Sequence, residues 1–245
     1  MSKLLAAFVV IVVSTVATGT LLAQDVDSGI TAYQSFISGA KAYQSGDYAT
    51  ALKKWKPLAE QGYATAQVSL GFMYDKGQGM PQDHAEAVKW YRKAAEQGDA
   101  IGQFSLGSMY YEGNGVAQDY AEAVKWYRKA AEQGDARGQF NFGGMYATGQ
   151  GVAQDYAEAV KWYRKAAEQG LAAAQNSLGA MYYEGTGIIQ DTMAAHMWFN
   201  IAAANGNENA LKNRDNAART LSSSQLVEAQ QRAKRCMASG YNYCD

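Results

Sequence analysis

Few side chains in this 245-residue chain have the types and spacing that catalysis requires. Ser38 and Lys41 stand three residues apart in SGAK, the spacing of the serine nucleophile and lysine in penicillin-recognising enzymes. Neither K-T-G nor S-D-N follows them in the sequence. The two histidines, His84 and His196, have no Cys, Asp or Glu at a repeated metal-ligand spacing. The sequence therefore predicts no enzyme, no metal site and no cofactor.

The two cysteines offer a different chemistry, because Cys236 and Cys244 both lie near the C-terminus. In an oxidising compartment, two cysteines this close can close a small loop. We expect a disulfide that holds the tail MASGYNYC against the last helix. Two free thiols are the alternative if the chain is not exported.

The N-terminus has the features of an export signal over residues 1–23. Lys3 supplies a positive start, and the run from Leu4 to Ala23 is apolar and uncharged. Ala23 is a plausible last residue before cleavage, and residues 24–30 would form a short linker. The run is nearly long enough to span a bilayer, so an uncleaved anchor at residues 4–23 is the alternative. Either way, we expect an exported protein: periplasmic, secreted, or anchored to the inner membrane.

The elements that must position these residues belong to a repeat. The segment AEAVKWYRKAAEQG occurs three times, beginning at Ala85, Ala121 and Ala157. Tryptophans follow the same spacing of 35 or 36 residues, at Trp55, Trp90, Trp126, Trp162 and Trp198. Self-similarity at such a period is typical of a solenoid. Four full units are predicted, at 63–98, 99–134, 135–170 and 171–206.

Each unit reads as two helices. The first ends at a Gly-rich turn, and the second begins after an Asp that can cap it, with a capping-box-like Glu three residues on in the first three units. The second helix ends at a Gly suited to a left-handed C-terminal position. Gly107 and its equivalents lie inside the first helix, where Gly costs about 1 kcal/mol relative to Ala. We infer that the second helix, with its Trp and Tyr, packs closely there.

This pattern resembles the Sel-one-like repeat, a relative of the tetratricopeptide repeat. The second unit carries it at Leu106, Gly107, Tyr110, Gly113, Gly115, Val116, Asp119, Ala123, Trp126, Tyr127, Ala130, Ala131 and Gly134. The match covers residues 63–206, and residues 31–62 resemble a shorter tetratricopeptide-like leading unit. The resemblance implies an all-α, right-handed superhelical solenoid of helix-turn-helix repeats. Residues 207–245 would supply capping helices and a tail.

Composition agrees with a folded chain whose net charge is close to zero. Apolar residues make up 48%, enough to bury a core. The formal net charge is −1, with both signs interspersed. This argues against a nucleic-acid surface, which needs clustered basic charge. A membrane contact is expected only if the N-terminal segment stays uncleaved.

The first helices differ between units on one side only, within an arc of about 120°. The resemblance implies that these helices line the concave surface of the solenoid, so the varied side is the candidate partner site. Its aromatic and charged residues suit a peptide or protein segment. The candidate residues are Phe72, Ile101, Phe104, Ser108, Tyr111, Glu112, Arg137, Phe140, Asn141 and Tyr183.

One alternative to this site remains open. The variation could be neutral drift on a solvent face, with Phe104 and Phe140 buried between units. His84 stands where later units have Tyr120 and Tyr156, which predicts a surface variant. The tryptophans are expected in the core, without a binding role.

The leading functional hypothesis is a non-enzymatic interaction scaffold of the bacterial cell envelope that binds a protein or peptide on the concave face. The alternative is a cell-envelope hydrolase, or a protein that binds a glycan or a β-lactam. That alternative comes from the envelope associations of the family, and the residues themselves do not favour it.

Overall fold

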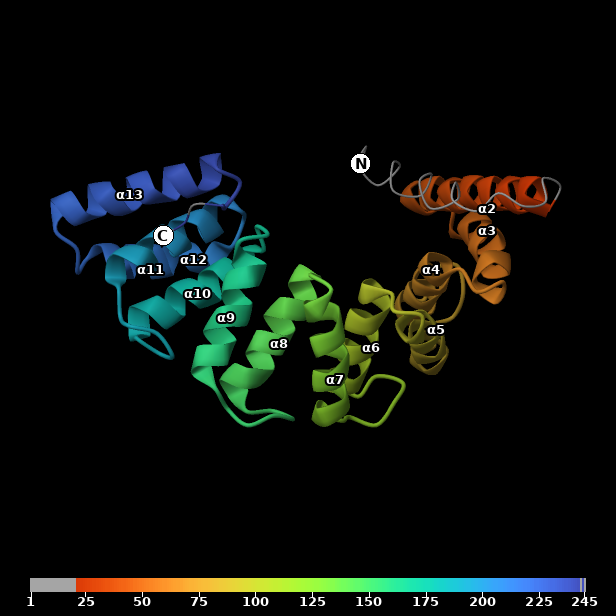
Figure 1. Ribbon diagram of the computed structural model, residues 1–245, viewed down its shortest axis with the longest axis horizontal. Helices are drawn as coiled ribbons and strands as arrows, with labels where there is room; N and C mark the ends of the chain where they lie inside the picture. Colours follow the sequence, from red (N-terminus) through yellow and green to blue (C-terminus); the bar gives the residue numbers. More distant parts are fainter. Residues whose placement is uncertain (1–20, 243, 245) are drawn as a thin grey trace.

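The computed structural model describes residues 21–242 and 244, and this part of the chain folds into twelve helices without a strand. The all-α fold is confirmed. Successive helix pairs follow one another along an arch, with α2 and α13 at its two ends (Figure 1). The helices are α2 (Leu21–Gln44), α3 (Tyr48–Glu60), α4 (Ala64–Lys76), α5 (His84–Glu96), α6 (Ala100–Glu112), α7 (Tyr120–Glu132), α8 (Ala136–Thr148), α9 (Tyr156–Ala167), α10 (Ala172–Glu184), α11 (Thr192–Ala204), α12 (Glu208–Ala218) and α13 (Ser223–Ala238).

The N-terminal helix begins earlier than the sequence suggested. Residues 1–20, most of the expected export signal, lie outside the described residues. Helix α2 runs through residues 24–30, so the predicted linker is wrong. Gly29 is the only strong helix breaker in that stretch, and one Gly costs only about 1 kcal/mol. Among the described residues, none of the helices combines the length and the apolar character that a membrane crossing requires.

The predicted caps begin every second helix of the four units. Each capping carboxylate accepts a hydrogen bond from the backbone N–H three residues on, at 2.9–3.0 Å. The caps are Asp83, Asp119, Asp155 and Asp191. The glutamates expected to complete capping boxes instead form ion pairs with exposed lysines three residues further along, as Glu122 does with Lys125.

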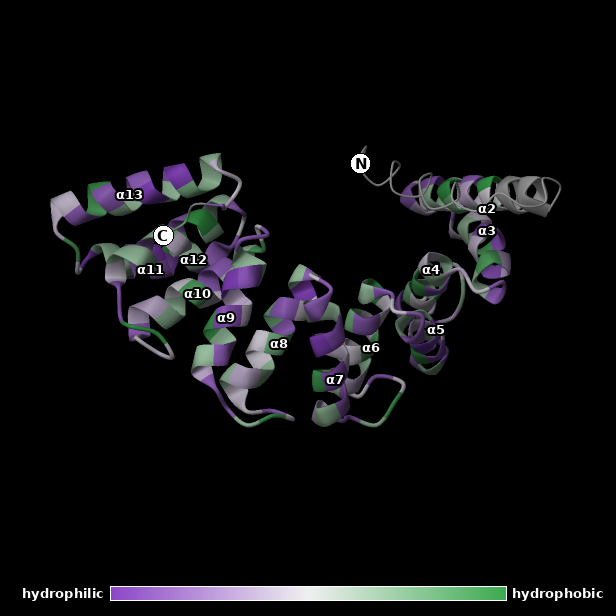
Figure 2. Cartoon of the chain, in the orientation of Figure 1, coloured by the Kyte–Doolittle hydropathy of each residue, from purple (hydrophilic) through white to green (hydrophobic). Residues whose placement is uncertain are grey.

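The glycine inside each first helix allows an aromatic ring to approach the backbone. A Cβ atom on Gly107 would lie 2.8 Å from the ring of Tyr127, and Gly71 and Gly179 meet Tyr91 and Phe199 at the same distance. The close packing is therefore as predicted, although Tyr and Phe make it and the tryptophans do not. Figure 2 shows the hydrophobic and hydrophilic residues alternating along the helices, as amphipathic packing requires.

The tryptophans fall into two classes that the sequence spacing did not separate. Trp55 is 5% exposed and lies against Gly39, where a Cβ atom would come within 2.5 Å of its indole. It therefore occupies the place of Tyr91 in the next unit, which explains the gap of 35 residues to Trp90. The tryptophans of the first three full units are only half-buried, each with a lysine 4.0–4.2 Å from its ring centroid: Trp90, Trp126 and Trp162.

A buried glutamine connects each unit to the one before it. Gln103 donates to the backbone oxygen of Ala95 at 3.2 Å and accepts from the side chain of Gln133 at 2.7 Å. The same two bonds recur in all four units, through Gln67, Gln103, Gln139 and Gln175. These polar groups are satisfied inside the interface, so they fix the register of stacking without a desolvation penalty.

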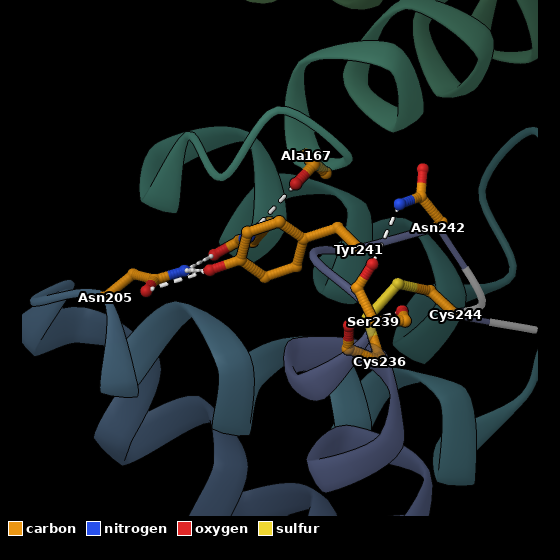
Figure 3. Close-up of a disulfide and its surroundings, with 8 residues drawn as sticks. Ala167, Asn205, Cys236, Ser239, Tyr241, Asn242 and Cys244 are labelled. Atoms are coloured by element: carbon orange, nitrogen blue, oxygen red, sulfur yellow. Dashed lines mark hydrogen bonds between the residues drawn. A yellow bond between two sulfur atoms is a disulfide. The ribbon is translucent and has the colours of Figure 1, made fainter. Parts of the chain in front are cut away.

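In the fourth unit, the C-terminal tail contacts Asn205, the residue that donates to the buried Gln175. Asn205 donates to the hydroxyl of Tyr241 at 2.8 Å, and the ring of Tyr241 packs against Gly170 (Figure 3). A disulfide joins Cys236 at the end of α13 to Cys244 in the tail. Tyr241 adopts a left-handed backbone conformation with φ of 69°, which this short return requires.

Candidate functional site

A groove of about 490 Å³ opens beside the first helices α4 and α6. The leading unit closes one end through Tyr43 and Trp55, and α8 reaches the other end through Arg137. Six of the ten predicted partner-binding residues line this one groove: Phe72, Ile101, Phe104, Ser108, Glu112 and Arg137.

The groove has an aromatic and aliphatic surface that remains open to solvent. Phe72 is 40% exposed and Ile101 is 46% exposed. The ring of Phe72 meets Tyr43 edge-on at 6.3 Å, and half-buried Phe104 lies 6.0 Å from the ring of Tyr127. Exposed large apolar side chains gathered in a concavity are the usual mark of a binding site.

Cations at the edge of the groove lie over these rings and are themselves paired. Lys76 lies 5.8 Å from the ring centroid of Phe72 and 2.8 Å from the carboxylate of Asp75. The guanidinium of Arg137 lies 4.4 Å from the ring centroid of Phe104, and Asp135 accepts from it at 3.1 Å. These contacts hold the side chains of Lys76 and Arg137 in place beside the aromatic surface to which a partner could bind.

His84 is not the simple surface variant that the sequence predicted. Its Nδ1 lies 2.9 Å from the carboxylate of Asp75, and both residues line the groove. The side chain of Asp75 is 13% exposed and that of His84 is 34% exposed. His84 begins α5, directly after the Asp83 cap, and α5 packs on α4, which carries Asp75. The helix start therefore aims the imidazole at the first helix.

The buried tyrosines beside the groove are neutral hydroxyl groups. Burial raises the pKa of Tyr91, and the charge of Asp75 raises it further. Burial raises the pKa of Tyr127 to about 12, although hydrogen bonds with Ser108 and Asn141 oppose the shift. Both phenols stay protonated at neutral pH, so they donate hydrogen bonds and contribute no charge.

Comparison with known proteins gives the family. The model of the Sel1 repeat matches residues 64–99, 100–135, 136–171 and 172–207. The chain belongs to the Sel1 repeat family. Each matched repeat begins one residue after the unit predicted from the sequence. No curated protein sequence matches the chain.

Solved structures place this Sel1 repeat protein among bacterial relatives. It is similar to c5321, a protective antigen of uropathogenic Escherichia coli strains with an SLR fold, at 36% identity and a TM-score of 0.72. That match covers 93% of this chain but only 53% of c5321, so the chain spans about half of that relative. A Sel1 repeat protein from Oxalobacter formigenes is 37% identical over 80% of this chain and 82% of its own, with a TM-score of 0.71. The immunity protein Pa5087 from Pseudomonas aeruginosa shares the fold at 18% identity, covering 87% of this chain and 84% of its own, with a TM-score of 0.52.

Four predicted residues of the Sel1 repeats do not line the groove. Phe140 packs on Tyr163, with ring centroids 5.5 Å apart, next to the core of the last two units. Asn141 forms a hydrogen bond with Tyr127, as noted above. Tyr183 packs beside the cluster around Phe199.

Tyr111, the fourth, is 37% exposed but turns to Tyr120, with ring centroids 5.4 Å apart. The prediction assumed one continuous surface along all four first helices. The groove is shorter, because the third unit has the small residues Gly144 and Ala147 where the first has Phe72 and Asp75.

Sequence reasoning missed five groove residues that lie outside the first helices of the full units. Tyr43 and Trp55 come from the leading unit, His84 and Tyr91 come from α5, and Asn114 comes from the turn after α6. For His84, the sequence did contain a clue. Asp75 and His84 stand where the second unit has Tyr111 and Tyr120, so the two positions change together between the units.

The remaining candidates for chemistry lie elsewhere. Ser38 and Lys41 are exposed on α2 and do not line the groove. A second cavity, of about 630 Å³, lies between the turn before α11 and the turn before α13, and none of the predicted residues lines it. Among the described residues, no three His, Cys, Asp or Glu side chains gather where they could hold a metal ion. His196 is 2% exposed in α11, away from both cavities.

Proposed function

We propose that this Sel1 repeat protein is a non-enzymatic adaptor that binds a peptide or protein segment in the groove beside α4 and α6. Sel1 repeat proteins commonly serve as scaffolds for protein–protein interactions. The observation that carries the proposal is the exposure of Phe72 and Ile101 around one concavity, next to the half-buried ring of Phe104. Burying such side chains against a partner contributes about 25 cal/mol per Å² of apolar surface.

Photo-crosslinking tests this proposal. A photoreactive phenylalanine analogue placed at Ile101 should crosslink a partner in cells, whereas the same analogue at Ile189 should not. Ile189 is the matched control, because it is 89% exposed but lies in the other cavity. Phe72→Ala and Phe104→Ala should abolish the crosslink at Ile101. A crosslink at Ile189 that is unaffected by these changes would place the partner elsewhere.

We further propose that the protein works in the bacterial cell envelope. The apolar N-terminal run and the disulfide between Cys236 and Cys244 support export to an oxidising compartment. Fractionation of cells, with the mass of the mature chain, tests this. Removal of residues 1–23 indicates a cleaved signal, an intact chain in the inner membrane indicates an anchor, and an intact chain in the cytoplasm overturns the proposal.

A non-enzymatic role predicts no turnover at the SGAK stretch. Nitrocefin and muropeptides should remain intact with the pure protein. Hydrolysis that is lost in Ser38→Ala would instead support an envelope hydrolase.

A further inference from the structure

One polar cluster distinguishes the first unit from the others. Asp75, Lys76 and His84 are held together by an ion pair at 2.8 Å and a hydrogen bond at 2.9 Å. The second unit has Tyr111, Glu112 and Tyr120 at the same three positions. The first unit has thus replaced a pair of tyrosines with an acid and an imidazole that contact each other, directly at the groove.

The charges that line the groove are not all compensated. Lys76 is paired with Asp75, and Arg137 is paired with Asp135. Among the described residues, the carboxylate of Glu112 accepts a hydrogen bond from the amide of Asn114 at 2.6 Å, and its charge also helps to raise the pKa of Lys76 from beyond ion-pair distance. Within residues 21–242, no basic side chain lies within 4 Å of Glu112. Glu112 is therefore the groove carboxylate that can accept a cation from a partner.

His84 adds a second acceptor to the same groove. In the neutral tautomer of His84 that carries its proton on Nδ1, this proton faces the carboxylate of Asp75. The Nε2 of that tautomer is then an acceptor, and it can bond a donor group of a partner. The carboxylate of Glu112 and the Nε2 of His84 in this tautomer thus both favour a partner group that donates N–H hydrogen bonds.

On this basis, and resting on the proposed function, we propose that the groove binds a peptide segment with a Lys or Arg next to a large apolar residue. The basic group pairs with Glu112 and His84, and the apolar side chain packs on Phe72, Ile101 and Phe104. An acidic peptide would place its carboxylate near Glu112 and lose affinity.

Selection of displayed random peptides on the full chain tests the partner chemistry. Peptides that bind wild type but not Phe72→Ala/Phe104→Ala are groove ligands, and we expect them to be enriched in Lys or Arg next to an apolar residue. Groove ligands without this basic preference would overturn the inference while leaving the proposed function intact. A selection that yields no groove-dependent peptide would overturn both.

Binding of one selected peptide then tests the role of Glu112. Glu112→Gln should weaken binding about threefold, as exposed ion pairs do, and Glu112→Lys about tenfold. Glu184→Lys is the matched control, because Glu184 holds the same position in the fourth unit and accepts from a turn residue in the same way. An equal loss for both lysine variants contradicts the proposal.

The first-unit cluster has its own test. The double variant Asp75→Tyr/His84→Tyr installs the pair that the second unit already packs, so the fold should be retained. We expect it to weaken basic peptides about fivefold and to leave a neutral variant of the same peptide within twofold. Equal weakening of both peptides would mean that the cluster only shapes the groove.

Discussion

The turn of the second unit packs directly on the first residue of α5: a Cβ atom at Gly115 would lie 2.2 Å from the backbone oxygen of His84. Gly151 and Gly187 meet the helix starts at Tyr120 and Tyr156 in the same way, at 2.3 and 2.4 Å. Each Gly-rich turn is therefore a packing element of the solenoid as well as a connector. Through this contact, the second unit also holds His84 in the groove.

Replacing Gly115 should be costly for two reasons. Gly115→Ala places a side chain at φ of 69° and drives it into the backbone at His84, so we expect a loss of about 2–4 kcal/mol in the free energy of unfolding. Gly134→Ala is the control, since its φ is 92° but nothing lies within 4 Å of the added atom. It should cost about 1 kcal/mol. Urea unfolding measures both variants, and equal losses would show that the contact contributes nothing.

The buried glutamines should contribute to the stability of stacking. Gln103→Leu removes a donor to Ala95 and leaves the amide of Gln133 without its acceptor, so we expect a loss of about 1–3 kcal/mol. Adding Gln133→Leu to that variant should cost little more, because the two residues act as one network. Full additivity in the double-mutant cycle would contradict this coupling.

The helix boundaries and caps were predictable from the sequence because the same residues recur at the same position in several units. The capping aspartates and C-terminal glycines recur at one period, so each position was supported several times. The leading unit had no such support. Trp55 was aligned with Trp90, but the structure gives it the place of Tyr91 against Gly39.

The site was predictable only in part, for a physical reason. Variation between units identifies a face, and that face supplied six groove residues. It does not show where the face turns into a concavity, and it omits residues such as Tyr43 and His84 that reach the groove from other elements. The leading unit packs against one end of the groove, and the repeat spacing of the sequence carries no information about that packing.

The disulfide should stabilise the C-terminal end alone. Cys236 and Cys244 are 8 residues apart, and closing so short a loop contributes roughly 2–3 kcal/mol. In Cys236→Ser/Cys244→Ser, Tyr241 should leave Asn205, and hydrogen exchange should quicken in α13. Exchange in α4 and α6 should not change, because repeat stability is transmitted only between neighbours. Reduced wild type serves as the control, and faster exchange throughout the chain would contradict a local role.

His196 should make the fold sensitive to acid. It is 2% exposed, and among the described residues its Nδ1 has no hydrogen-bond partner. Burial lowers the pKa of His196, and nearby Arg214 lowers it further while Asp215 opposes the shift. Because the folded state binds the proton less well than the unfolded state, protonation favours unfolding. Stability should therefore fall as pH drops below about 6.5, by at most about 1.4 kcal/mol per pH unit, until the lower pKa of the folded state is reached.

The earlier units supply the replacement that tests this. Val88, Val124 and Val160 occupy the position of His196, so His196→Val installs a side chain that the framework already accommodates. We expect the variant to gain about 1–2 kcal/mol at pH 7, because an unpaired buried polar group is removed. Its free energy of unfolding should also lose the slope below pH 6.5, which urea titrations at pH 7 and pH 5 would measure. An unchanged slope with a destabilised protein would mean that the imidazole is paired in solution.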